Sequence, residues 1–236
     1  MYFDVMGNGV AVADGLVCSG SYAGPSADGK HDVFLTAGHC LPPAELGILP
    51  SQILVSFDGD ASDGVAAPIK VSEYHQMPGF GRNLGDLRDL GILLLPARSV
   101  TGIPAVRLPT AGYLDTLKAA GSLKFRIVDL VGYGVIPVWE PAGPTTFEFD
   151  GVRRSGTSII TGLHQTMVHY NQQRNGIGTG SGLCFGDSGS PQFDRGTLLV
   201  LSVTSGGNGQ CNANNENYRV DTPQAREFLG RFLALP

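Results

Sequence analysis

The chain has 236 residues, of which 42% are hydrophobic and 16% are charged, and its net charge is −5. This composition is typical of one large or two small globular domains and excludes an intrinsically disordered chain. The acidic balance argues against nucleic acid as a partner, and no run of about 18 apolar residues predicts a membrane span.

The opening residues 1–9, MYFDVMGNG, have neither the basic flank nor the apolar core of a signal peptide. Two explanations stay open at this point. Either the protein is cytosolic, or it is secreted and its leader is not part of this sequence.

Strand-like apolar runs recur along the chain, each bounded by Gly, Asp, Asn or Pro. They lie at residues 33–37, 52–57, 90–95, 125–134 and 197–205. The proline-rich segment 96–110 predicts a connector between two halves. At the end, Thr222 is a good cap for a helix that begins at Pro223, with apolar residues at helical spacing: Ala225, Phe228, Leu229, Phe232 and Leu233. Short strands with one C-terminal helix predict an all-β barrel or sandwich protein.

Four cysteines are present, and none belongs to a C-x-x-C pair, so a zinc or redox site is not expected. Two lie early in the chain and two late. Of the three possible pairings, this order favours Cys18–Cys40 and Cys184–Cys211. Four buried free thiols are the alternative. If the disulfides form, the protein belongs to an oxidising compartment.

The segment CFGDSGSP, residues 184–191, raises the question of whether Ser188 is a nucleophile or part of an ordinary turn. A serine nucleophile needs a base, most often histidine, and a group that orients the base. All five histidines precede Ser188: His31, His39, His75, His164 and His169. This order excludes α/β-hydrolases and the lipase-like GDS hydrolases, in which the histidine follows the serine.

The remaining order is His, then Asp, then Ser. His39 ends a strand-like run in FLTAGHC, and Asp89 precedes an apolar strand in RDLGILLL. Asp86 competes for the third role, but we favour Asp89 because Asp86 lies on the approach to the strand. The other four histidines fit no site pattern, and no glycine motif indicates a nucleotide cofactor.

TAGHC, DLGILLL and GDSGSP, in this order, resemble the chymotrypsin-like (trypsin-type) serine peptidases. The resemblance covers nearly the whole chain. Further matching segments are VCSG at 17–20, VGYG at 131–134, LVLSVTSGG at 199–207 and NYRVDTPQAREFL at 217–229.

The resemblance implies an all-β fold of two antiparallel six-stranded β-barrels of the chymotrypsin type with a C-terminal helix. Residues 1–103 would form the barrel that carries His39 and Asp89, and residues 104–236 the barrel that carries Ser188. The implied activity is that of a serine endopeptidase. Ser188 would attack the scissile carbonyl, His39 would transfer the proton, and Asp89 would orient His39. The N–H groups of Gly186 and Ser188 would bind the oxyanion, with no metal or cofactor.

Asp187 matches the aspartate that pairs, in many members of this family, with a newly freed N-terminus. Only 17 residues precede Cys18 here, and MYFDV is not an Ile-Val-Gly-Gly start. An internal cation is the alternative partner, because a buried carboxylate needs one. The candidates are Arg126, Arg153, Arg154 and Arg174.

For the substrate pocket, the resemblance places Gly182 on the floor and Ser202, Val203 and Thr204 on the wall. A neutral floor, with the β-branched Thr204 narrowing the opening, predicts small or medium apolar residues before the cleaved bond. Glu216 opposes this expectation, since a carboxylate pointing inward would favour basic residues. We expect Glu216 to be solvated and the pocket to be neutral.

The implied partners are a peptide or protein substrate and protein inhibitors, with no nucleic acid and no membrane, and the protein is expected to be a secreted monomer. Two other functions stay open. One is a protease-like binding module that has lost catalysis, and the other is an esterase-type acyl hydrolase that uses the same site.

Overall fold

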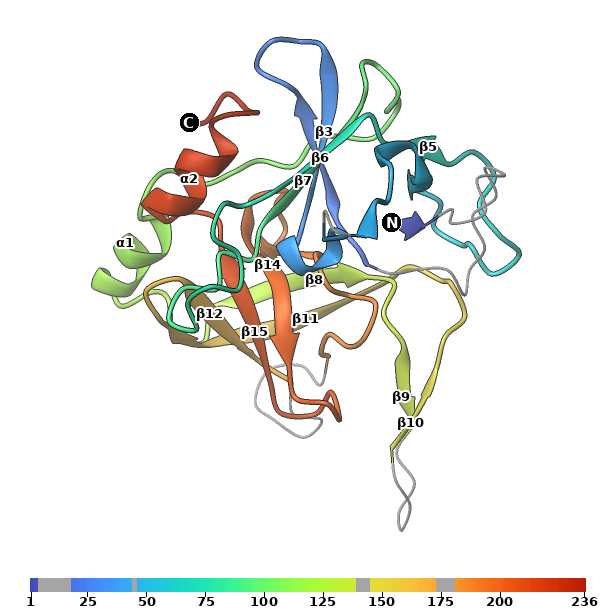
Figure 1. Ribbon diagram of the computed structural model, residues 1–236. Coiled ribbons are helices and arrows are strands. Elements are labelled where there is room, and N and C mark those ends of the chain that lie inside the picture. The colour runs from blue at the N-terminus through green and yellow to red at the C-terminus, as the bar shows by residue number, and fades with distance from the viewer. Residues whose placement is uncertain (4–17, 44–45, 139–144, 173–180) are drawn as a thin grey trace.

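Strands dominate the computed structural model, which describes residues 1–3, 18–43, 46–138, 145–172 and 181–236. Two helices and two short 3-10 turns complete the described secondary structure (Figure 1). The turns are η2 (Gly38–Cys40) and η4 (Pro50–Gln52). Among the described elements, no helix is long and apolar enough to cross a membrane.

The apolar runs of the first half form two sheets, with strand orders β2-β3-β7-β6 and β1-β4-β5. Their strands are β1 (Tyr2–Phe3), β2 (Ser21–Pro25), β3 (His31–Thr36), β4 (Ile53–Val55), β5 (Ile69–Lys70), β6 (Glu73–Gln76) and β7 (Gly91–Pro96). Strands β3 and β7 pair antiparallel, from His31 opposite Pro96 to Thr36 opposite Gly91. The end of β3 and the beginning of β7 therefore lie at one edge of the sheet.

Six strands of the second half close into a barrel in the order β11-β12-β15-β14-β13-β8. They are β8 (Ile127–Gly132), β11 (Arg154–Leu163), β12 (Met167–Asn171), β13 (Pro191–Asp194), β14 (Val200–Gly207) and β15 (Asn214–Arg219). Strands β9 (Ile136–Val138) and β10 (Thr146–Glu148) pair with each other and project away from the barrel (Figure 1).

The predicted C-terminal helix is present as α2 (Pro223–Leu229). Thr222 Oγ1 accepts a hydrogen bond of 3.2 Å from the Ala225 N–H, as expected for a cap. Phe232 and Leu233 lie beyond the end of α2. The sequence analysis did not predict α1 (Tyr113–Ala119), which buries only Leu114 and therefore shows no apolar stripe.

The apolar core has two parts. One runs from β3 and β7 to Val200 and Val203 of β14 and to helix α2. The other fills the barrel around Leu130, Ile160 and Leu201. The predicted mostly β fold with a C-terminal helix is confirmed. One of the two expected six-stranded barrels is found closed, in the second half, and the described strands of the first half form a four-stranded and a three-stranded sheet.

Candidate active site

His39 and Asp89 meet at the edge where β3 ends and β7 begins. His39 lies in η2, which follows β3, and Asp89 lies just before β7. Asp89 Oδ2 is 2.8 Å from His39 Nδ1, and Asp89 Oδ1 accepts a 2.8 Å hydrogen bond from the His39 backbone N–H. When Nδ1–H donates to this carboxylate, the neutral imidazole carries its free lone pair on Nε2. The pair thus positions Nε2 to act as a base.

The two competing carboxylates have different partners. Ser205 Oγ donates a 2.5 Å hydrogen bond to Asp89 Oδ2, so Asp89 is held from both sides. Asp86 instead accepts 2.7 Å from Tyr218 Oη and 3.3 Å from Arg88 Nε. The preference for Asp89 over Asp86 therefore agrees with the geometry. The sequence analysis did not single out Ser205, although it follows directly on the segment assigned to the pocket wall.

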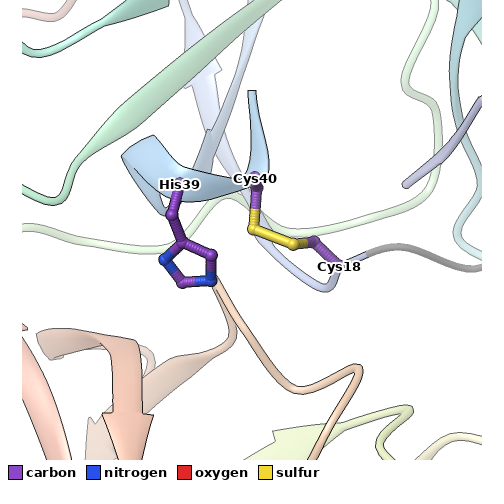
Figure 2. Close-up of side chains that lie close together, drawn as sticks. All are labelled: Cys18, His39 and Cys40. Atoms are coloured by element: carbon purple, nitrogen blue, oxygen red, sulfur yellow. A yellow bond between two sulfur atoms is a disulfide. The ribbon is translucent and has the colours of Figure 1, made fainter. Parts of the chain in front are cut away.

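His39 lies beside the disulfide that joins Cys18 and Cys40 (Figure 2). A ring nitrogen of His39 and the two sulfur atoms lie within 4.8 Å of one another. Metal binding by cysteine requires thiolates, and these sulfurs are bonded to each other, so this cluster is a structural clamp rather than a metal centre. The disulfide fastens η2, which carries His39, to the segment that begins at Cys18.

The second predicted disulfide is also present. Cys184 and Cys211 are joined with an S–S distance of 2.00 Å, and the part of the chain that the structure describes holds no free cysteine. Cys184 begins the loop that carries Ser188, so this bridge ties that loop to the segment between β14 and β15.

Ser188 lies in the loop that leads into β13, and this loop packs against the turn after β3. The Ser19 N–H donates a 2.7 Å hydrogen bond to Ser188 O. Gly189 has a φ of +83°, and a Cβ at this position would lie 2.1 Å from Thr36 Oγ1 and 2.4 Å from Ser19 O. Only glycine allows this backbone approach. The Ser188 loop is thereby held against the segment that carries His39.

Two backbone N–H groups beside Ser188 are available to bind an anion. Gly186 has a φ of 94°, and its carbonyl accepts a 2.8 Å hydrogen bond from Ser19 Oγ. Within the described chain, no group accepts a hydrogen bond from the N–H of Gly186 or of Ser188. Paired N–H donors next to a serine hydroxyl are the arrangement that stabilises an oxyanion.

The contact between Ser188 Oγ and His39 is not formed. Across the described residues, no hydrogen bond joins these two side chains. The two segments are nevertheless connected, because Ser188 O accepts a hydrogen bond from Ser19 and the neighbouring Cys18 forms a disulfide with Cys40, next to His39. Catalytic hydrogen bonds are often long before substrate binds. The structure therefore shows His39 bonded to Asp89, and the backbone of Ser188 lies against the segment that carries His39.

Asp187 is a buried carboxylate whose partners are backbone N–H groups. It accepts 2.8 Å hydrogen bonds from Gly134 and from Cys184. A Cβ on Gly132 or Gly134 would lie 1.8 Å or 2.1 Å from its carboxylate oxygens, so the segment VGYG needs glycine at both positions. Burial raises the pKa of Asp187 to about 6, against the opposite effect of the backbone hydrogen bonds.

Four arginines were candidate partners of Asp187, and the three that lie among the described residues bond to other groups. Their acceptors are Asp194 for Arg126 (2.7 Å), Asp150 for Arg154 (2.5 Å) and the Phe57 carbonyl for Arg153 (3.3 Å). Arg174 lies outside the described residues. Oriented backbone dipoles hold the Asp187 carboxylate in the geometry seen here.

A pocket of about 210 Å³ opens next to Ser188. The Cys184–Cys211 disulfide and strand β14 form its sides, and none of its described lining residues is charged. These residues are Leu183, Cys184, Phe185, Ser188, Thr204, Ser205, Gly206, Gly207, Asn208, Cys211 and Asn215.

The pocket wall differs from the one expected from sequence. Ser202 and Val203 are 0% and 1% exposed and lie inside the protein, away from the pocket. Thr204 does border the pocket, but the wall then continues through Ser205, Gly206 and Gly207. The wall is therefore shifted along β14 from the expected one, and beyond Thr204 it includes two glycines, which have no side chain to narrow the opening.

Ser202 and Thr204 belong instead to a buried polar network, which we define as Tyr170, Ser190, Gln192, Ser202 and Thr204. Tyr170 Oη lies 2.8 Å from Ser202 Oγ, which donates 2.7 Å to Gln192 Oε1. Gln192 Nε2 donates 2.7 Å to Thr204 Oγ1, which lies 2.8 Å from Ser190 Oγ. Ser190, the second serine of GDSGSP, is thus a member of this polar network.

The floor of the pocket also differs from expectation. Gly182 was expected to form the floor of the pocket. A Cβ on Gly182 would lie 2.1 Å from Gln172 Cγ, so the Gln172 side chain occupies the space beside this glycine. Neighbouring residues of a strand point to opposite faces. On β15, Asn215 is buried and lines the pocket, whereas Glu216 is exposed and pairs opposite His169. The pocket is neutral because Asn215, and not Glu216, lies in it.

Comparison with known proteins gives a family and two fold neighbours. A family profile described as Trypsin matches residues 10–228. The solved structure of HL collagenase has a TM-score of 0.65 and 17% identity over 98% of this chain and 96% of that chain. Human heparin binding protein has a TM-score of 0.64 and 17% identity over 94% and 88%. No curated protein sequence matches the chain. At this identity, the two structures share its fold.

Proposed function

The chain belongs to the trypsin family, and we propose that it is a serine endopeptidase that hydrolyses peptide bonds through His39, Asp89 and Ser188. One observation carries the proposal. The buried Asp89 carboxylate lies 2.8 Å from His39 Nδ1, at the sheet edge against which the Ser188 loop is fastened. A binding protein has no need of an imidazole oriented in this way.

In the proposed reaction, Ser188 Oγ attacks the carbonyl carbon of the scissile peptide while His39 Nε2 takes the hydroxyl proton. The N–H groups of Gly186 and Ser188 stabilise the oxyanion. His39 then gives its proton to the leaving amine, and an acyl-enzyme remains on Ser188. A water molecule, deprotonated by His39, releases the acyl group and restores the serine. Asp89 keeps the imidazole in the required tautomer and stabilises its charged form.

The same site is chemically able to cleave esters, and a family member without activity would keep the fold as a binding module. Reaction with a fluorophosphonate, followed by mapping of the modified residue, separates an active site from a binding module. We expect an adduct on Ser188 that is absent from Ser188→Ala. An adduct on another residue, or none on the folded protein, would refute the proposal. Matched peptide and ester substrates then distinguish a peptidase from an esterase.

Two disulfides are typical of proteins from oxidising compartments, so we place the enzyme outside the cytosol, in an extracellular or periplasmic setting. Protein substrates and protein inhibitors are its proposed partners, and it acts as a monomer. Residues 1–103 and 104–236 are the proposed domains, which contribute His39 with Asp89 and Ser188 respectively.

A further inference from the structure

Two histidines of the barrel, His164 and His169, lie ring against ring outside the proposed active site. Their ring centroids are 4.6 Å apart, and the ring planes are inclined by 41°. His164 follows directly on β11 and His169 lies in β12, so the rings come from the two arms of one hairpin. Among the residues that the structure describes, neither imidazole has a hydrogen-bond partner. Their ring nitrogens are therefore available to a ligand.

The backbone of β11 makes this contact possible. The register of β11 against β12 shifts between Ile160 and Gly162, as in a β-bulge, and Gly162 lies opposite His169. A Cβ on Gly162 would lie 3.7 Å from His169 Cβ and 3.8 Å from His164 Nε2. The His164 ring therefore reaches back over Gly162 to the side of His169, because glycine has no side chain to separate them.

Glu216 adds a carboxylate beside the two rings. Strands β12 and β15 lie side by side, and Glu216 of β15 is directly opposite His169 (Figure 1). Side chains directly opposite each other in antiparallel strands have Cβ atoms about 4.5–5.5 Å apart. The other cross-strand neighbour of Glu216 is Gly206 of β14, which has no side chain. The exposed Glu216 carboxylate bonds to no described residue, so it is free to turn toward the histidines.

Charge at this surface favours a cation. One cation contacts the hairpin, since Arg219 Nη1 donates a 2.9 Å hydrogen bond to His164 O. Its charge is compensated by two carboxylates, Asp115 at 2.5 Å and Asp221 at 2.9 Å. Arg219 therefore adds no uncompensated positive charge beside the histidines, and Glu216 has no cation of its own within the described chain.

Two imidazoles and one carboxylate are the ligands that a divalent transition metal prefers. Imidazole suits zinc, copper and nickel, whereas calcium and magnesium take oxygen ligands. Zinc is bound in other proteins by two histidines, one glutamate and a water molecule. Among the described residues, three ligand atoms lie within 4.8 Å of one another only at Cys18, His39 and Cys40. Binding at the hairpin therefore requires the exposed Glu216 side chain to rotate toward the rings.

We propose that His164, His169 and Glu216 form a binding site for Zn²⁺ or a similar divalent transition metal, with water as the fourth ligand. The ion ties the hairpin of β11 and β12 to β15. It stabilises the folded barrel, because a ligand that binds the folded state shifts the unfolding equilibrium toward it. The site uses no residue of the proposed triad and does not depend on peptidase activity.

Titration calorimetry of the whole protein with Zn²⁺ measures the site. His164→Gln and His169→Gln should each weaken binding by at least about 10- to 100-fold, since loss of even an outer-shell partner costs this much. His75→Gln is the matched control, because His75 lies 3.2 Å from a single carboxylate, Glu73, and it should leave the affinity unchanged. No binding by the unaltered protein, or equal affinities in all four proteins, would overturn the inference.

Cu²⁺ identifies the ligands and separates this site from His39. The nitrogen hyperfine splitting in the electron paramagnetic resonance spectrum counts the imidazoles bound to the ion. We expect two nitrogens in the unaltered protein and one in His164→Gln or His169→Gln. Two nitrogens in either variant would place the ion elsewhere and refute the site.

Glu216→Gln tests the third ligand. It should weaken Zn²⁺ binding while the two nitrogens of the Cu²⁺ spectrum remain, because only the carboxylate is lost. The Tm of the unaltered protein should rise when Zn²⁺ is added, and this rise should be smaller in Glu216→Gln. An unchanged Zn²⁺ affinity in this variant would show that Glu216 is not a ligand.

Discussion

The four-stranded sheet of β2, β3, β7 and β6 and the six-stranded barrel both have an apolar interior, and the barrel interior also contains the buried polar network. In the sheet, Val33, Leu35 and Ile92 are 0% exposed and pack through apolar contacts. In the barrel, Gln192 and Ser202 are also 0% exposed, yet they belong to the polar network. Burial is equal in the two regions, but these parts of the sheet depend on apolar packing alone, whereas the barrel combines apolar packing with directional bonds.

This difference extends to the two parts of the proposed active site. The antiparallel pairing of β3 with β7, two strands with apolar interiors, sets where His39 and Asp89 meet. Hydrogen bonds set the Ser188 loop, through the carboxylate of Asp187 and through the Ser190–Thr204 contact. Removing a single polar atom from a buried hydrogen-bond network lowers the free energy of unfolding, because its partner is left unpaired. In an apolar interior, the loss of stability depends on the volume that is removed.

The largest expected effect is on the barrel side of the site. Ser188→Ala should lower kcat by about a million-fold if the triad acts as a unit, because the nucleophile is lost and the remaining groups have nothing to activate. Steady-state hydrolysis of a peptide substrate measures this. An unchanged rate would mean that the barrel does not supply the nucleophile.

The sheet side of the site should be nearly as sensitive. Asp89→Asn should lower kcat by about ten-thousand-fold, because an amide donates to His39 Nδ1 and stabilises the wrong tautomer. Asp86→Asn is the matched control and should change kcat little, since Asp86 bonds Tyr218 and Arg88. A larger loss in Asp86→Asn than in Asp89→Asn would contradict the assignment.

The same contrast explains which features could be predicted from sequence. Strands β3 and β7 contain apolar runs and were predicted as strands, and the family resemblance predicted that Asp89 orients His39, whereas the pairing of β3 with β7 was not predicted. Strand β15, NNENYR, has no apolar run, although Asn215 and Tyr218 are buried in it. Only the resemblance of residues 217–229 to the family's closing strand and helix indicated a strand there.

The pocket was predicted less well for the same physical reason. Ser202 was assigned to the pocket wall, but its hydrogen bonds satisfy it inside the barrel, whereas Thr204 borders the pocket and also bonds to Gln192. Gln172 lies ten residues before Gly182, and its side chain occupies the space beside that glycine. Neither the hydrogen bonds of Ser202 nor the contact of Gln172 with Gly182 produces a local pattern in the sequence.

A third prediction tests the apolar interior of the sheet. Leu93→Ala should reduce the free energy of unfolding by about 2–5 kcal/mol, since Leu93 is 0% exposed and its loss opens a cavity. Leu93→Met keeps the volume and should cost less than about 1.5 kcal/mol. Denaturant unfolding of both variants measures the difference. Similar losses in both would show that the sheet does not depend on volume.

A fourth prediction concerns Asp187 and pH. Its pKa of about 6 in the folded protein is above the unfolded value, so the native state binds the proton more strongly. This contribution to stability is complete below about pH 4 and is lost as pH rises through 6, a change of at most about 3 kcal/mol. Asp187→Asn should remove it. The measurement is the difference in unfolding free energy between the two proteins from pH 4.5 to pH 7.5, and a difference that is constant across this range would refute the assignment.

The smallest expected effect, and the sharpest test of the contrast, lies in the polar network. Ser202→Ala removes one hydroxyl and little volume, yet it leaves Tyr170 Oη and Gln192 Oε1 without their partner, and should cost about 1–3 kcal/mol. Tyr170→Phe removes the hydroxyl on the other side of the same bond. If directional bonding holds the barrel, the double variant should cost clearly less than the two single losses added together, since no unpaired tyrosine hydroxyl remains. Denaturant unfolding of the four proteins in the cycle measures this coupling. Strictly additive losses would mean that the barrel, like the sheet, is held by packing, and that the hydrogen bonds between β12 and β14 contribute no energy of their own.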